Sequence, residues 1–200
     1  MRVLAARPSE DSSTAERLRR AMRSHAAGVT IVTVPGPAGF TATSFTSVSL
    51  KPALVSFCLD RAASTLPQVR AAEHFAVHLL AADGVELARR FARSGTDRFA
   101  GIRWTPTREG VPLLPDAPGW LLATVVLRQR LGDHIQVVGE LLEVGGGPGE
   151  APLVYHDGGF AAPHPLRAGQ PTPPPTSPLT TPPPPPTLSA APAPAPRTAS

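Results

Sequence analysis

Short apolar runs, separated by turn signals, extend along the chain to about residue 160. β-Branched residues are frequent in these runs, which is typical of strands. The predicted strands span residues 29–34, 40–44, 54–59, 75–80, 120–131, 135–144 and 153–155. The Pro- and Gly-rich segment 35–39 predicts a hairpin turn between the first two strands, and Gly132-Asp133-His134 joins the two long ones.

Helical spacing of apolar residues is confined to short stretches. Residues 13–16 (Ser-Thr-Ala-Glu) have the spacing of a capping box, and apolar residues then recur at helical spacing until Gly28. A second capping box at residues 83–86 predicts a helix to about residue 92, and residues 64–71 predict a shorter one. Many strands, few helices and no regular strand–helix alternation indicate an antiparallel β-barrel rather than a doubly wound parallel sheet.

Proline content divides the chain. More than half of the 26 prolines lie after residue 162, where they alternate with Thr, Ser and Ala and leave little material for a core. We therefore expect a flexible start over residues 1–13, one domain over residues 14–163 and a disordered, Pro-rich tail over residues 164–200. A domain of about 150 residues is long enough to bury one hydrophobic core.

Charge and cysteine content argue against several classes of function. The net charge of +4 comes from dispersed arginines, without the basic, aromatic-rich stripe of a nucleic-acid-binding protein. The single cysteine, Cys58, cannot form an intrachain disulfide, so a reducing cytoplasm is expected. No apolar run reaches the roughly 18 residues of a membrane helix, and the N-terminus lacks a signal peptide's apolar segment. No metal site is expected either, because the i, i+4 pair His74 and His78 straddles the start of a predicted strand, where this spacing does not bring two ligands together as it would on a helix.

The densest candidate chemistry is a run of hydroxyl side chains that follows the predicted hairpin turn. Residues 39–50 contain six Ser and Thr residues, interspersed with small or flat side chains. Such a run favours binding of a polar, planar ligand, because small side chains leave backbone N–H groups exposed. The alternative is an ordinary solvated strand face. Motifs of dinucleotide-binding folds, phosphate loops and serine hydrolases are absent from the sequence.

Seven segments, in the same order along the chain, resemble the flavin reductase-like family, whose members have an FMN-binding split barrel. The resemblance covers about residues 15–162. It is carried by residues 18–33, 47–55 (Ser-Val-Ser-Leu-Lys-Pro-Ala-Leu-Val), 61–65 (Arg-Ala-Ala-Ser-Thr), 75–80 (Phe-Ala-Val-His-Leu-Leu), 89–92 (Arg-Arg-Phe-Ala), 132–140 (Gly-Asp-His, then Gly-Glu) and 152–160. Two features depart from the family: His78 stands where an asparagine is often found, and the Pro-rich tail has no counterpart.

The resemblance implies a mainly β fold with short helices, the FMN-binding split β-barrel. It also implies an NAD(P)H-dependent flavin reductase, which transfers hydride from NADH or NADPH to FMN or FAD and supplies reduced flavin to a partner monooxygenase. The family's flavin pocket lies at a subunit interface, so a homodimer is expected. Two alternatives stay open: a flavoprotein that keeps FMN tightly bound and oxidises a small molecule, and a non-enzymatic flavin- or haem-binding protein.

The resemblance further implies where the flavin binds. Hydroxyls of Ser64 and Thr65, with the guanidinium of Arg89 or Arg90, are expected at the flavin phosphate. His134 is expected to be catalytic, although it could equally be a turn residue whose neighbour Asp133 closes the turn. The other expected cofactor-binding residues belong to the hydroxyl run: Thr41, Ala42, Thr43, Ser44, Phe45, Thr46, Ser47 and Ser49.

Overall fold

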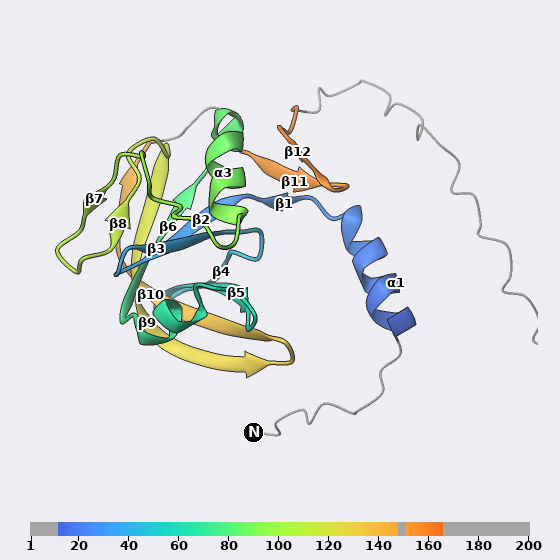
Figure 1. Ribbon diagram of the computed structural model, residues 1–200, viewed down its shortest axis with the longest axis horizontal. Coiled ribbons are helices and arrows are strands. Elements are labelled where there is room, and N and C mark those ends of the chain that lie inside the picture. Colours follow the sequence, from blue (N-terminus) through green and yellow to red (C-terminus); the bar gives the residue numbers. More distant parts are fainter. Residues whose placement is uncertain (1–11, 148–150, 166–200) are drawn as a thin grey trace, which may run out of the picture. The chain divides into compact units, whose positions relative to one another are not determined.

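The computed structural model describes residues 12–147 and 151–165. The predicted flexible start and Pro-rich tail therefore lie almost entirely outside the described residues. Antiparallel strands and a few short helices make up the described part, as the sequence predicts (Figure 1). Among the described helices, none combines the length and the apolar character needed to cross a membrane.

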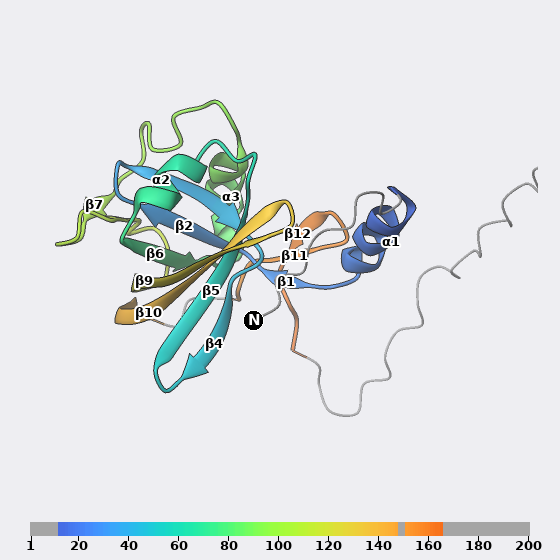
Figure 2. The ribbon, with the colours of Figure 1, turned by 90° about the horizontal axis from the view of Figure 1, so that it is seen from below.

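Seven antiparallel strands form the central sheet (Figures 1 and 2). Their order across the sheet is β3-β2-β6-β9-β10-β5-β4. Their bounds are β2 Thr30–Val34, β3 Ala38–Ala42, β4 Thr46–Leu50, β5 Ala53–Asp60, β6 His74–Leu79, β9 Gly119–Leu131 and β10 His134–Gly146. The long β9–β10 hairpin ties the two halves of this sheet together, because β9 pairs with β6 and β10 pairs with β5.

Shorter elements surround the central sheet. Strands β1 (Ala27–Gly28), β11 (Val154–His156) and β12 (Gly159–Ala161) form a second sheet, and β7 (Thr105–Pro106) pairs with β8 (Pro112–Leu113). The helices are α1 (Ser12–Arg23), α2 (Leu66–Ala71), the 3₁₀ turn η1 (Ala82–Gly84) and α3 (Val85–Ala92). An ion pair of 3.0 Å between Arg23 and Asp157 links the end of α1 to the turn between β11 and β12.

Aromatic side chains form the centre of the core. Phe57 of β5 packs edge-to-face against Phe40 of β3 and Phe75 of β6, with ring centroids 5.7 and 5.1 Å apart. The core thus joins β5, in one half of the strand order, to β3 and β6 in the other half. Gly139 of β10 is required here, because a Cβ at this position would collide with the Phe75 ring. Phe91 of α3 belongs to a second buried cluster, which fixes that helix next to β3.

Three sequence-based expectations for the elements are wrong. The first helix ends at Arg23 instead of continuing to Gly28, because the chain turns into strand β1. The expected capping box at residues 83–86 does not form: no side chain caps α3, and Glu86 pairs with Arg89 instead. Strand β4 was not among the predicted strands: Val48 and Leu50 alternate with Ser47 and Ser49, but the segment is short, rich in Ser and Thr, and forms a largely exposed sheet edge.

Candidate functional site

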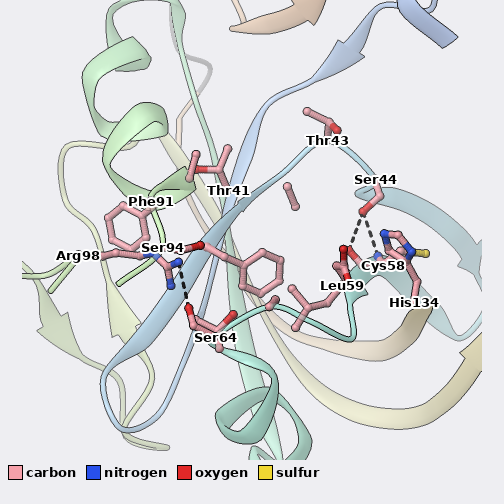
Figure 3. Close-up of a pocket in the computed structure, with 16 residues that line it drawn as sticks. Thr41, Thr43, Ser44, Cys58, Leu59, Ser64, Phe91, Ser94, Arg98 and His134 are labelled. Atoms are coloured by element: carbon pink, nitrogen blue, oxygen red, sulfur yellow. Dashed lines mark hydrogen bonds between the residues drawn. The ribbon is translucent and has the colours of Figure 1, made fainter. Parts of the chain in front are cut away.

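A cavity of about 320 Å³ opens where strands β3 and β5 meet the segment before α2 and the loop that follows α3 (Figure 3). The first residue of β10 completes its wall. The lining residues are Phe40, Thr41, Ala42, Thr43, Ser44, Cys58, Leu59, Asp60, Ala63, Ser64, Thr65, Phe91, Ala92, Ser94, Arg98 and His134. The structure thus gathers Thr41, Ala42, Thr43, Ser44, Ser64, Thr65 and His134 from the predicted site around one cavity.

Two hydroxyls of the predicted run that line this cavity are already bonded within the protein. Thr41 donates its Oγ1 hydroxyl to the carbonyl of Ala88, 2.6 Å away, and so holds β3 against α3. The Ser44 hydroxyl bridges to β5: it accepts the Cys58 N–H at 2.9 Å and donates to the Cys58 carbonyl at 3.1 Å. These hydroxyls shape the wall, whereas the exposed Thr43 makes no hydrogen bond of this kind among the described residues.

Four residues of the run do not reach this cavity. Phe45 and Thr46 line a neighbouring cavity of about 570 Å³, which shares Thr43 and Ser44 with the first. Ser47 and Ser49 lie on strand β4, where Ser49 accepts a hydrogen bond from the backbone N–H of Lys51. The structure therefore divides the hydroxyl run between a cavity wall and an edge strand.

The two candidate phosphate-binding arginines on α3 also lie away from the cavity. Arg89 donates to Glu86 at 2.5 Å and lies over the ring of Phe160, with its guanidinium carbon 5.8 Å from the ring centroid. Arg90 donates to the carbonyl of Ala100 at 2.7 Å. Arg89 thus pairs within α3 and lies over a residue of β12, Arg90 links α3 to the loop that contains Ala100, and neither lines the cavity.

Arg98, in the loop after α3, is the arginine that lines the cavity. Its Nε donates to the Arg93 carbonyl at 2.7 Å, its Nη1 to the Gly39 carbonyl at 3.0 Å and its Nη2 to the Ser64 hydroxyl at 3.4 Å (Figure 3). Partial burial lowers the pKa of the Arg98 guanidinium from its ordinary value. Because a guanidinium has five N–H donors, two remain for a ligand. No local motif in the sequence singles out Arg98 from the other dispersed arginines.

Thr65 adds an unpartnered polar atom to the same end of the cavity. Its Oγ1 and Arg61 Nε are the buried side-chain polar atoms that lack a hydrogen-bond partner within the part of the chain that the structure describes. Thr65 is only 5% exposed. A buried hydroxyl without a partner costs about 1–3 kcal/mol, so an anionic ligand oxygen at this point would relieve that cost. Arg98, Ser64 and Thr65 together fit a phosphate group.

His134 lies at the opposite end, where β10 begins. Its Nδ1 is 2.7 Å from Oδ1 of Asp133, and about two-fifths of its side chain is exposed. The hydrogen bond from His134 lowers the pKa of the Asp133 carboxyl. A carboxylate only accepts, so Nδ1 carries the proton and Nε2 is left free to accept or donate one. The histidine is therefore oriented by Asp133 and lines the cavity.

Cys58 is the other reactive group in the wall. Burial raises the pKa of its thiol, which favours the protonated, weakly nucleophilic form. Among the described residues, no three His, Cys, Asp or Glu side chains cluster as a metal site would require. The cavity thus offers a phosphate-sized cluster of donors, a flat wall of small side chains and one oriented histidine. This combination fits a planar ring that carries a phosphate.

Comparison with known proteins gives a consistent picture. A family model described as a flavin reductase like domain matches residues 22–164. The NADH:FMN oxidoreductase of Rhodococcus erythropolis is 43% identical over 156 residues, which are 74% of this chain and 81% of that protein.

Solved structures agree with the sequence comparison. SgcE6, the NADH:FAD oxidoreductase of Streptomyces globisporus C-1027 in complex with NAD and FAD fragments, has a TM-score of 0.72 at 34% identity, over 80% of this chain and 98% of that one. BorF, the flavin reductase component of a bacterial two-component tryptophan halogenase, has a TM-score of 0.69 at 35% identity, over 74% of this chain and 97% of that one. These likenesses confirm the predicted fold.

Proposed function

Because the chain belongs to the flavin reductase-like family, we propose that it is an oxidoreductase that reduces FMN or FAD with NADH or NADPH. The observation that supports this most is the buried Oγ1 of Thr65, unpartnered beside the Arg98 guanidinium at one end of a cavity with a flat, small-residue wall. The Rhodococcus relative is named for NADH and FMN, and SgcE6 for NADH and FAD.

The phosphate of the flavin is assigned to Arg98, Ser64 and Thr65. Arg98 supplies the charge and two spare N–H donors, and the Thr65 hydroxyl supplies a third donor from a buried position. This assignment replaces Arg89 and Arg90, whose guanidinium groups are held by Glu86 and by the Ala100 carbonyl.

The ring is assigned to the wall between β3 and β5. Ala42, Thr43 and Ser44 present small side chains there, and Ser44 locks the two segments together through the backbone of Cys58. A rigid wall matters because ring stacking at reactive distance depends on a fixed orientation. We expect Phe45, Thr46, Ser47 and Ser49 to act indirectly, by positioning this wall.

The chain's own chemistry is limited to binding, orientation and proton control. A bound flavin itself accepts the hydride of a reduced nicotinamide, so no side-chain nucleophile is needed. His134 is the proposed catalytic residue, because its Nε2 can accept or donate a proton at the cavity while Asp133 fixes the ring through Nδ1.

Release of reduced flavin to a partner monooxygenase is the proposed role. Its support is that Thr43, Ser44 and Ser64 of the cavity are exposed, so the site is open to solvent and a flavin can leave. The similar protein BorF is named as the flavin reductase component of a two-component tryptophan halogenase, which is in line with this role. The single cysteine and its protonated thiol suit the reducing cytoplasm proposed as the location.

A homodimer is proposed on the basis of exposed apolar side chains. Several lie on strands β4, β9 and β10 of the central sheet, and Leu50 of the edge strand β4 is 84% exposed. Large exposed apolar side chains in this number favour an interface. The residues are Val48 and Leu50 of β4, Val126, Leu127 and Leu131 of β9, and Leu142 and Val144 of β10. Light scattering of Leu50→Glu against the unchanged protein tests this: a shift to monomer supports the interface, and an unchanged monomer mass in both contradicts it.

The proposed activity is tested by the loss of NADH or NADPH absorbance with FMN or FAD, added first in catalytic amounts and then in excess. A rate that rises with added flavin supports a reductase with flavin as substrate. A rate independent of added flavin, in protein that purifies yellow, supports a flavoprotein with bound FMN instead. Absence of turnover with all four combinations contradicts the proposal.

A further inference from the structure

A second cavity, of about 190 Å³, adjoins the first on the far side of the proposed phosphate position. The two cavities share Ser64, Thr65 and Arg98. Its remaining residues, around the start of β3, on α2 and in the loop that contains Asp97, take no part in the proposed binding of the flavin ring. Because it begins at the residues proposed to hold the flavin phosphate, any ligand that extends beyond that phosphate meets it directly.

The wall that the two cavities share, formed by Ser64, Thr65 and Arg98, offers hydrogen-bond donors for more than one phosphate oxygen. Arg98 spans it, from the Gly39 carbonyl on β3 to the Ser64 hydroxyl before α2, and retains two N–H donors. Thr65 lines both cavities, is only 5% exposed, and has an Oγ1 without a hydrogen-bond partner among the described residues. A diphosphate lying across the wall would satisfy donors from both sides.

The chemistry changes beyond the wall. Asp97 brings a carboxylate, one oxygen of which accepts the Phe99 N–H at 2.9 Å, and Gln68 of α2 brings an amide. A carboxylate repels a further phosphate but accepts hydrogen bonds from ribose hydroxyls. The amide can both donate and accept, as the edge of an adenine ring requires, and Pro37 offers a flat apolar surface. The second cavity therefore suits a neutral nucleoside attached to phosphates held at Arg98.

We propose that this second cavity binds the adenosine end of FAD, with the diphosphate across Arg98 and Thr65, so that the protein binds FAD more tightly than FMN. The inference rests on the proposed function and specifies its flavin. The same adenosine diphosphate group occurs in NADH, but the cavity begins at the proposed flavin phosphate, which assigns it to the flavin.

The experiment measures dissociation constants of riboflavin, FMN and FAD for the full chain by flavin fluorescence or calorimetry. Gln68→Trp fills the second cavity from an exposed helix position, and Arg70→Trp is the matched control, because Arg70 is exposed on the same helix and does not line the cavity. Circular dichroism verifies that both variants fold.

We expect FAD to bind about tenfold more tightly than FMN, equivalent to about 1.4 kcal/mol. Gln68→Trp should abolish this difference by weakening FAD alone, and Arg70→Trp should preserve it. Equal affinity for FMN and FAD in the unchanged protein overturns the inference, as does a Gln68→Trp variant that still prefers FAD.

A further measurement distinguishes whether the second cavity binds FAD or the nicotinamide nucleotide. The KM for NADH, measured with FMN as acceptor, should be the same in Gln68→Trp and Arg70→Trp. A KM raised in Gln68→Trp, with the dissociation constant of FAD unchanged, would assign the cavity to NADH and overturn the inference. Reduction of FMN in any of these cases leaves the proposed function standing, whereas failure to reduce any flavin defeats the proposed function itself.

Discussion

Replacing His78 by asparagine is predicted to reduce the protein's loss of stability in mild acid. His78 of β6 is fully buried, donates its Nδ1–H to the Ile31 carbonyl at 3.2 Å and accepts the Leu114 N–H on Nε2 at 3.1 Å. Protonation would break the Leu114 hydrogen bond and place a charge in the core. Burial therefore lowers the pKa of His78 from 6.5 to about 4, against a smaller opposing effect of the bond to Ile31.

The sign and size of the effect follow from that pKa. The folded state binds the proton more weakly than the unfolded state, so unfolding takes up a proton between pH 6.5 and about pH 4. The stability that His78 contributes is complete above pH 6.5 and decreases as the pH falls toward 4. At about 1.4 kcal/mol for each pH unit, the full decrease is about 3 kcal/mol.

The assay is denaturant unfolding, followed by circular dichroism, at several pH values across this window. Asparagine suits the position because its amide also donates and accepts but does not titrate. His74→Asn is the control, because His74 lies at the start of the same strand and is partly exposed. We expect the free energy of unfolding of the unchanged protein and of His74→Asn to fall about 3 kcal/mol further than that of His78→Asn. Parallel pH profiles for all three proteins would refute the reasoning.

Three other predictions concern two residues of the site and the C-terminal tail. Arg98→Ala should weaken FMN binding about tenfold or more, because charge-assisted hydrogen bonds to the phosphate are lost, and should leave riboflavin binding unchanged. The control Arg90→Ala should bind both FMN and riboflavin normally. Equal weakening of riboflavin binding by Arg98→Ala would contradict a phosphate role. His134→Ala should lower kcat about 100-fold while the dissociation constant of FMN stays unchanged, and a normal kcat would remove its catalytic role. Deletion of residues 165–200 should leave steady-state turnover unchanged, and a loss of turnover would show that the tail takes part.

The sequence was sufficient to predict the long strands. Residues 120–131 and 135–144 are apolar enough on their buried faces to be recognised, and their structural counterparts β9 and β10 are only slightly longer. Strand β4 escaped prediction because backbone pairing with β5, rather than burial of its own side chains, holds it in place. The end of α1 was also misplaced, since no residue between Arg23 and Gly28 is a strong helix breaker.

Site residues in segments with a local sequence pattern were predicted. Those that only the tertiary fold brings to the site were missed. Thr65 and His134 fall in segments with recognisable local patterns, and both line the cavity. Arg98 does not, because only the fold carries its loop to the Gly39 carbonyl and the Ser64 hydroxyl. The bonds that occupy Thr41 and Ser44 are likewise long-range, so sequence alone could not distinguish wall residues from ligand-binding ones.

The central claim is that this chain reduces flavin as a substrate. Its most direct test is to mix catalytic protein anaerobically with NADH and an excess of FMN, and to measure the equivalents of flavin reduced per protein chain. The account predicts that many equivalents are reduced, with FAD giving the same result. Reduction of at most one equivalent per chain would show a bound prosthetic flavin. Absence of reduction of both FMN and FAD would contradict the claim.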